Sequence, residues 1–289
     1  MTIVLTGATG FTGSHLLAQL RERGIRPRCF VRATSDTSNL HDVEIVEGDL
    51  GDVASLARAF DGASVLLNTA SIGFGHGPGI VAAAERAGIS RAIFISTTAI
   101  FTTLNAKTKS VRMEAEEAIR KSGLQWTVIR PTMIYGTSRD RNMARLIRYL
   151  SRWPVMPVAG RGNHLLQPIH VDDVARAMLQ ALDHDVAIGR DYNIAGKEPL
   201  TFNGVIDVVA ARLGRRVLKL HLPLRLMAAM LAFAERGPVR LPVRSEQLLR
   251  LGEDKAFDYS AASRDFGFAP LAFEEGISRE IESMGLGPK

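Results

Sequence analysis

The chain has 289 residues, of which 46% are hydrophobic and 23% are charged. This balance is typical of a globular protein and excludes a disordered or fibrous chain. The length allows one large α/β domain, or a large domain with a smaller lobe. The net charge is +6, but there is no dense run of Lys and Arg and only 6% of the residues are aromatic. We therefore expect a small anionic ligand and no nucleic acid.

The single cysteine, Cys29, excludes an internal disulfide and disfavours a metal–thiolate site. The N-terminal residues lack the basic segment and the long apolar stretch of a signal peptide. The best membrane candidate, residues 222–234, contains Arg225 and is too short to span a bilayer. As an amphipathic stretch it lacks a second anchoring signal, so we expect a cytoplasmic protein without membrane association.

In the first half of the chain, short apolar runs alternate with helical stretches. The predicted strands are residues 3–6, 28–31, 43–47, 65–68, 92–96 and 127–130. The predicted helices are residues 14–23, 53–60, 79–87 and 111–121. This alternation predicts an α/β fold of the Rossmann type, in which helices cover both faces of a doubly wound parallel sheet.

After Pro131 the pattern changes to helices separated by loops rich in Pro and Gly. The helices predicted there are residues 142–152, 172–183, 200–213, 224–234 and 246–251. We therefore expect residues 1–165 to form the Rossmann domain, with its sheet completed by parts of 166–200. Residues 200–289 are then expected to form a smaller, mainly helical substrate lobe, interleaved with the first domain.

A glycine-rich segment from Gly7 to Gly13 follows the first predicted strand and opens the first helix. Gly7 permits a tight turn, Gly10 lets the backbone approach a pyrophosphate, and Gly13 allows the helix to pack closely on the strand. The N-terminus of the helix offers free N–H groups and a partial positive charge. Three glycines in this strand–turn–helix context predict a dinucleotide-binding loop.

The end of the second predicted strand distinguishes NAD from NADP. An NAD-specific site usually places Asp or Glu there, where it holds the 2′-hydroxyl of the ribose. This chain has no acid before Asp36, and it places Arg32 directly after the strand. A planar guanidinium suits a 2′-phosphate, so we expect NADP(H) to be preferred over NAD(H). The alternative is that Arg32 is a surface residue without a ligand.

Four further motifs follow the glycine loop in order. They are Gly-Asp-Leu at 48–50, Asn-Thr-Ala-Ser at 68–71, Arg-Pro-Thr-Met-Ile-Tyr-Gly at 130–136 and Ile-His-Val-Asp-Asp-Val-Ala at 169–175. Together they make nearly the whole chain resemble the short-chain dehydrogenase/reductase superfamily, in its extended and atypical branches.

The resemblance implies a role for each motif. Residues 48–50 would contact the adenine, 68–71 would lie under the cofactor, 130–136 would lie beside the nicotinamide, and 169–175 would join the lobes. From the loop and the resemblance, the expected cofactor-binding residues are Gly7, Thr9, Gly10, Phe11, Thr12, Gly13, Arg32, Asp49, Leu50, Thr69, Ala70, Ser71, Pro131, Thr132 and Met133.

The chemistry of the family uses a tyrosine as proton donor or acceptor, with a lysine four residues later that lowers the pKa of the tyrosine. Here the alignment places Thr108 at the tyrosine position and Arg112 at the lysine position. A threonine hydroxyl ionises several units higher than a tyrosine, and an arginine cannot act as a proton shuttle. The family's substrate-holding hydroxyl matches Thr98.

We therefore expect an atypical NADP(H)-binding member that acts on a small molecule, with an anionic substrate as one option. It would be an oxidoreductase, or a sugar-nucleotide epimerase/dehydratase-like enzyme, with a non-standard acid. A non-catalytic NADP(H)-binding redox sensor or assembly factor is the alternative. The resemblance does not decide between a monomer and a homodimer.

Two further features have alternative interpretations. His76 follows the fourth predicted strand, on the nicotinamide side, and is either a substitute acid or an exposed loop histidine. Four arginines fall on one helical face in and just before the helix predicted at 142–152, and they suit an acidic ligand or partner as well as plain solvent. They are Arg141, Arg145, Arg148 and Arg152.

Overall fold

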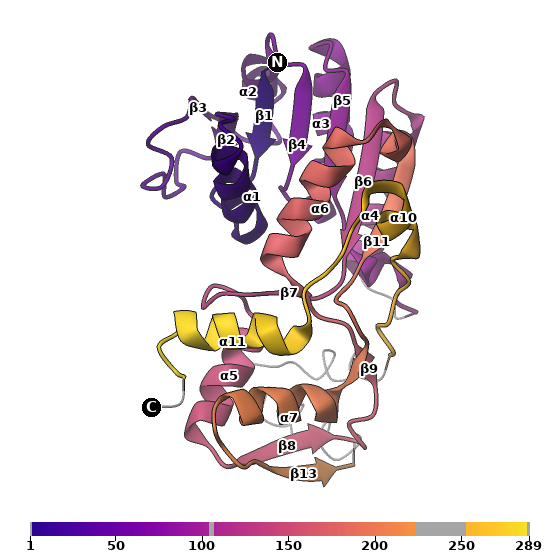
Figure 1. Cartoon of the computed structure of the whole chain (residues 1–289). Coiled ribbons are helices and arrows are strands. Elements are labelled where there is room, and N and C mark those ends of the chain that lie inside the picture. Colours follow the sequence, from indigo (N-terminus) through magenta and orange to yellow (C-terminus); the bar gives the residue numbers. More distant parts are fainter. Residues whose placement is uncertain (1, 104–106, 224–252, 288–289) are drawn as a thin grey trace, which may run out of the picture. The chain divides into compact units, whose positions relative to one another are not determined.

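The computed structural model describes residues 2–103, 107–223 and 253–287 (Figure 1). They form two compact units, and the chain passes from one to the other several times. The first unit comprises Met1–Thr132, Val171–Ile194 and Phe257–Pro270, and the second comprises Met133–His170, Ala195–Ala256 and Leu271–Lys289. Residues 133–165 thus group with the second unit, whereas the sequence pattern assigned them to the first. The helices predicted at 224–234 and 246–251 lie outside the described residues.

A seven-stranded parallel sheet forms the centre of the first unit, in the order β11-β6-β5-β4-β1-β2-β3. Its strands are β1 (Ile3–Thr6), β2 (Arg28–Val31), β3 (Ile45–Glu47), β4 (Val65–Asn68), β5 (Arg91–Ile95), β6 (Gln125–Pro131) and β11 (Arg190–Ile194). Strands β1, β4 and β5 are buried along their whole length because helices cover both faces of the sheet. This strand order confirms the predicted Rossmann-type sheet, in which the order reverses between β1 and β4.

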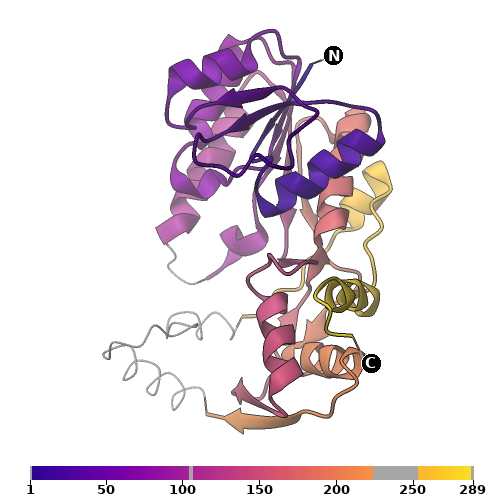
Figure 2. The ribbon, with the colours of Figure 1, turned by 90° about the vertical axis from the view of Figure 1, so that its left-hand side faces the viewer.

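Helices lie on both sides of the sheet (Figure 2). On one side α1 (Phe11–Glu22) packs against α6 (Val171–Asp183). On the other side α2 (Val53–Phe60), α3 (Gly77–Arg86) and α4 (Lys107–Lys121) pack in that order. Their apolar faces form one core with alternate sheet residues such as Val4, Leu66 and Phe94. The sequence predicted all five helices, although α1 and α4 begin three and four residues earlier than expected.

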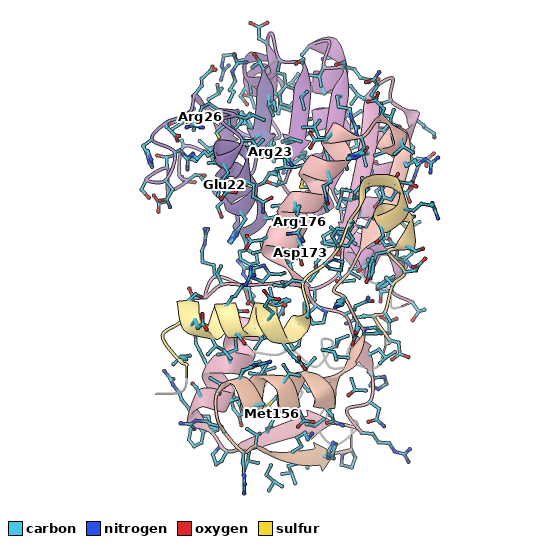
Figure 3. The ribbon with its side chains drawn as sticks, viewed as in Figure 1. Glu22, Arg23, Arg26, Met156, Asp173 and Arg176 are labelled. Carbon is cyan, nitrogen blue, oxygen red and sulfur yellow. The ribbon has the colours of Figure 1, made fainter. Side chains whose placement is uncertain are left out.

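Shorter elements complete the first unit. Short 3₁₀ helices η1 (Ile72–Phe74) and η2 (Thr98–Phe101) follow β4 and β5, and η3 (Asp185–Ala187) precedes β11. Helix α10 (Ser260–Phe266) covers the edge strand β11, where the hydroxyl of Tyr192 donates to Asp265 at 2.8 Å. The motif expected at 169–175 reaches α6, where Asp173 is buried and pairs with Arg176 one turn later (Figure 3).

The second unit packs three helices together, α5 (Met143–Arg152), α7 (Phe202–Arg212) and α11 (Phe273–Ser283). Three short strand pairs accompany them. They are β7 (Ile134–Tyr135) with β10 (Ile169–His170), β9 (Leu165–Leu166) with β12 (Leu200–Thr201), and β8 (Val155–Ala159) with β13 (Leu218–Leu222). The sequence predicted α5 and α7 but missed these strands, because most are too short to show a periodicity. Among the helices in the described part of the chain, none combines the length and apolar character that a bilayer crossing requires.

A pair of buried carboxyl groups lies within the second unit. Glu280 of α11 is fully buried. Its neighbour Asp140 precedes α5 and accepts hydrogen bonds from the amides of Asn142 and Ala144. Burial first, and then the neighbouring Asp140 carboxyl, raise the pKa of Glu280 to about 10. Glu280 is therefore protonated at neutral pH.

Replacing Glu280 by glutamine keeps the shape and removes this titration. In the unfolded chain Glu280 ionises near its ordinary pKa of 4.5, whereas in the folded chain it stays protonated up to about pH 10. The contribution of Glu280 to the free energy of unfolding is therefore largest below about pH 4.5, and it decreases as the pH rises towards about 10. We expect Glu280→Gln to gain at least ~1 kcal/mol over the wild type between about pH 5 and about pH 8.

Urea unfolding of both proteins at the two pH values measures this difference. Glu282→Gln, an exposed neighbour on α11, is the control and should follow the wild type. An identical pH dependence for the wild type and Glu280→Gln would contradict the protonated state of Glu280.

Candidate functional site

The carboxyl ends of β1 and β4 are tied together where the order of the sheet reverses. The hydroxyl of Thr6 donates to the side chain of Asn68 at 2.6 Å. Both the amide and the hydroxyl of Thr69 donate to the carbonyl oxygen of Thr6, at 3.1 and 2.7 Å. The side-chain amide of Asn68 donates to the carbonyl of Ala70 at 2.9 Å. This crevice is where parallel α/β sheets bind their ligands, and hydrogen bonds hold its edge in place.

The glycine loop is folded tightly onto this edge. Gly7 has a φ of +74°, and an added Cβ there would lie 2.8 Å from the amide nitrogen of Ala70. An added Cβ on Gly13 would lie 2.0 Å from the carbonyl oxygen of Gly7. The amide of Gly10 closes the turn by donating to the same oxygen at 2.8 Å. A side chain at Gly7 or Gly13 would therefore push α1 away from the strands.

The N-terminus of α1 has the features of an anion site. Gly10 is its N-cap residue, and no side chain caps the first turn. The amides of Phe11, Thr12 and Gly13 precede the first intrahelical hydrogen bond, which the amide of Ser14 makes to Gly10. The first turn also carries no acidic residue. These amides, which have no partner within the helix, and the helix dipole fit a pyrophosphate.

Arg32 directly follows β2, and its side chain is exposed. Its carbonyl oxygen accepts from the amide of Ser35 in a tight turn, at 2.8 Å. Within the described residues, its guanidinium makes no hydrogen bond or ion pair. The first acid after the strand, Asp36, accepts from the amide of Ser38. The end of β2 thus presents a cation rather than a carboxylate.

The turn after β3 is also ordered by its own side chains. Asp49 accepts from the amide of Gly51 at 2.7 Å, and Leu50 packs against the core beneath it. An added Cβ on Gly51 would lie 3.7 Å from Cε1 of His76. His76 therefore lies beside the turn that the resemblance assigns to adenine, whereas its place after the fourth predicted strand suggested the nicotinamide side. The sequence could not show this contact, because η1 lies between β4 and His76, which is the N-cap residue of α3.

The candidate catalytic residues lie on η2, which follows β5, and on α4, which packs against η1. Thr98 begins η2 and is buried, and its hydroxyl donates to the carbonyl of Pro131 at 3.3 Å. Thr108 and Arg112 are one turn apart on α4, and Arg112 donates to the hydroxyl of Thr108 at 2.6 Å. Arg112 also lies flat against η1, since an added Cβ on Gly73 would come within 2.8 Å of its Nε. Thr108 and Arg112 thus form one hydrogen-bonded pair.

A buried ion pair anchors α4 beneath this pair. Glu116, one turn after Arg112, accepts from Nε and Nη2 of Arg130 on β6, at 3.0 and 2.6 Å. The hydroxyl of Ser96 donates to Glu116 at 2.6 Å, and Arg130 also pairs with Asp191 on β11. The sequence motif at 130–136 includes Arg130, but the pattern did not predict its pairing with Glu116. The available signal was that Glu116 shares the buried face of α4 with Ile119, an unusual place for a carboxylate.

The four tyrosines of the chain are all elsewhere. Tyr192 is held by Asp265, and burial followed by that hydrogen bond raises its pKa to about 12. Tyr135 and Tyr149 belong to the second unit, and Tyr259 precedes α10. No described residue of η2 or α4 is therefore a tyrosine.

The last predicted cofactor residues follow β6. Pro131 ends the strand, and the amide of Thr132 donates to Ile194 at 3.0 Å, which pairs the chain with the end of β11. Met133 is the first residue of the second unit, where its carbonyl accepts from Ile169. A role of Met133 beside a nicotinamide stays a prediction.

Comparisons with known proteins agree with this geometry. The model of a family described as NAD(P)H-binding matches residues 7–185. A ceramide reductase from Caulobacter vibrioides is 32% identical over 190 aligned positions, and the match covers 61% of this chain and 59% of that protein. A mitochondrial subunit of Arabidopsis thaliana, NADH dehydrogenase 1 alpha subcomplex subunit 9, is 27% identical over 274 residues, covering 86% of this chain and 68% of the subunit.

The structure resembles that of a UDP-glucose 4-epimerase from Thermotoga maritima, with a TM-score of 0.77 and 19% identity over 99% of each chain. At this identity the likeness concerns the fold alone, and that fold agrees with the resemblance that the motifs suggested. The family model covers more than half of the sequence and begins at the glycine loop. The chain belongs to the NAD(P)H-binding family.

Proposed function

We propose that the first unit binds NADP(H) in preference to NAD(H), and that the protein is an oxidoreductase with a non-standard arrangement at the proton-transfer position. The observation that carries this proposal is the uncapped N-terminus of α1, packed against the ends of β1 and β4, together with exposed Arg32 at the end of β2. Amides suit the pyrophosphate, and a guanidinium suits the 2′-phosphate.

In the proposed complex, the other predicted residues surround the same crevice. Thr9 belongs to the glycine loop, Asp49 and Leu50 border the adenine, and the segment from Thr69 to Ser71 forms the floor. Pro131 and Thr132 border the nicotinamide, as the family resemblance implies. When bound, the cofactor supplies or accepts a hydride.

The pair on α4 determines how a proton could move. The hydroxyl of Thr108 accepts a hydrogen bond from Arg112, whose guanidinium stays charged at any physiological pH. Arg112 can hold a ribose hydroxyl or a substrate oxygen as a fixed cation, but it cannot release a proton. The proton of a reduction would then come from water or from the substrate itself, and Thr98 would position the reacting oxygen.

The second candidate is a non-catalytic NADP(H) binder that acts as a redox sensor or an assembly factor. The hydrogen bonds of Thr98 to Pro131 and of Arg112 to Thr108 favour it, because both threonine hydroxyls are engaged within the protein. One relative is named as a subunit of a larger complex, which agrees with such a role.

Turnover distinguishes the two candidates. The purified protein is mixed with NADPH and a panel of ketones, ceramide-type carbonyl lipids and UDP-sugars, and the absorbance of NADPH is followed. Oxidation of NADPH with one substrate class supports the oxidoreductase. Normal NADPH binding without oxidation across the panel supports the second candidate.

Arg32→Ala should weaken NADPH much more than NADH. Loss of charge-assisted hydrogen bonds to the 2′-phosphate should lower the NADPH affinity about 10- to 100-fold, whereas NADH lacks that phosphate and should bind as before. Calorimetric titration with each dinucleotide measures both affinities. Arg58→Ala, at another exposed arginine of the first unit, is the control. Equal losses for NADPH and NADH would remove the 2′-phosphate role.

Gly13→Ala should abolish or strongly weaken binding of either dinucleotide. The new Cβ would lie 2.0 Å from the carbonyl oxygen of Gly7, so α1 must shift away from β1, at a cost of about 1–3 kcal/mol or more. Gly79→Ala on α3 is the matched control, because nothing lies within 4 Å of its added Cβ. Titration calorimetry and thermal unfolding report the two effects. Unchanged affinity in Gly13→Ala would mean that phosphates do not bind at this turn.

A further inference from the structure

The parallel strand pair β8–β13 of the second unit has one entirely apolar face. The register pairs Leu218 with Val155, Leu220 with Pro157, and Leu222 with Ala159. Partners in register point to the same side of a sheet, and alternate residues along a strand do so too. We call the side formed by these six residues the outer face. Leu218 is 67% exposed, Leu220 49% and Val155 38%.

The opposite face of the pair is turned towards α7. Lys219 pairs with Asp207 of α7 at 2.7 Å, and His221 lies 3.2 Å from the side-chain oxygen of Asn203. Met156 of β8, labelled in Figure 3, packs against the core of the second unit, of which Val158 is a buried member. These contacts fix the orientation of the strands, so the leucines of the outer face must point away from α7. The leucine side chains are exposed because the strand register places them on this side of the pair.

A basic surface adjoins the outer face. Helix α5 buries one side against the core and exposes the other, which carries Arg145, Arg148 and Arg152. Arg141, which is also exposed, stands two residues before the helix. Two more exposed arginines, Arg215 and Arg216, stand just before β13. Neither of the segments 141–159 and 215–222 contains an acidic residue.

Two aromatic residues connect the basic and apolar parts. Tyr149 lies among the arginines of α5, and its hydroxyl donates to the carbonyl of Val155 at 3.0 Å. Trp153 links α5 to β8 and is 59% exposed. The surface therefore runs from arginines through Tyr149 and Trp153 to aliphatic side chains. We call the whole of it the basic–apolar face.

We propose that the basic–apolar face binds the surface of an anionic lipid bilayer. Positive charge without any acid in these segments is complementary to anionic headgroups. Exposed tryptophan and tyrosine favour the boundary between headgroups and acyl chains. The leucines and Val155 can enter the edge of the acyl region, which removes their apolar surface from water. An acidic protein would satisfy the arginines but would leave the aliphatic outer face without a matching apolar partner.

This face is distinct from the stretch at 222–234 that the sequence singled out. It is assembled from α5 and from two strands about sixty residues apart in the chain, and pairing of those strands creates the apolar part. It does not depend on the cofactor proposal.

Sedimentation with lipid vesicles tests the proposal on the full-length protein. Vesicles of phosphatidylcholine alone are compared with vesicles of an equimolar mixture of phosphatidylcholine and phosphatidylglycerol. We expect binding to the mixed vesicles that weakens with added salt, and at least tenfold weaker binding to phosphatidylcholine. Equal binding to both, or binding to neither, overturns the proposal.

Variants locate the binding to this face. Arg145→Gln with Arg152→Gln should reduce partitioning to the mixed vesicles about 25-fold, since each arginine contributes about fivefold. Arg58→Gln with Arg86→Gln removes the same charge from exposed positions of the first unit and is the control. An equal loss in both double variants would show that only net charge matters, and it overturns the proposal. Thermal unfolding checks that each variant folds.

The apolar part has its own test. Leu218→Asn with Leu220→Asn should reduce binding to the mixed vesicles at least tenfold, whereas Val186→Asn, an exposed residue of η3, should not.

The chain has two tryptophans, so in a Trp126→Phe background the fluorescence reports on Trp153 alone. It should shift to shorter wavelength with mixed vesicles. An unshifted spectrum overturns insertion of this face. The proposal is also overturned if the wild type forms a dimer, the leucine variant is monomeric, and neither binds vesicles. In that case a second copy of the chain covers the outer face.

Discussion

The first turn of α1 lies so close to the end of β1 that an added Cβ on Gly13 would come within 2.0 Å of the carbonyl oxygen of Gly7. That approach is possible only because neither residue carries a side chain. It leaves the first amides of α1 uncapped above the point where the order of the sheet reverses. The hydrogen bonds of Thr69 to Thr6 hold β4 against the same turn. The amides proposed to bind a pyrophosphate thus depend on one helix–strand contact.

Buried charge plays a corresponding role for α4. A carboxylate and a guanidinium inside a protein lose their hydration, and they regain stability only when their geometry and remaining hydrogen bonds are good. Glu116 meets this condition with Arg130 and Ser96. Compared with apolar residues at the same positions, such a network adds little stability, but it fixes the position of α4 relative to β5 and β6. Arg112 and Thr108, one and two turns earlier on the same helix, are positioned by it.

Each unit contains groups in places that are unusual for their polarity. In the first unit the unusual groups are polar backbone atoms left uncapped at a helix end. In the second unit a glutamic acid is buried next to an aspartate, while leucines and a tryptophan are exposed beside arginines. Local rules of burial are most often broken where a protein binds something, so these departures mark the surfaces of interest. The first unit thus offers backbone amides to a ligand, whereas the second offers apolar and basic side chains.

The sequence alone determined the Rossmann-type sheet, the glycine loop and the family, because each is encoded by neighbouring residues. Apolar runs with glycines at this spacing are typical of a strand–turn–helix unit. It also predicted that Thr108 and Arg112 occupy the positions where the superfamily it resembles has a tyrosine and a lysine. Only the tertiary structure showed that these two residues bond to each other, and that the hydroxyl of Thr98 faces the carbonyl of Pro131. Only it showed that His76 lies beside the turn after β3, that Glu116 pairs with Arg130, that Glu280 is buried and that β8 pairs with β13. The physical reason is that these contacts join residues distant in the chain, whose approach depends on packing and register rather than on local periodicity.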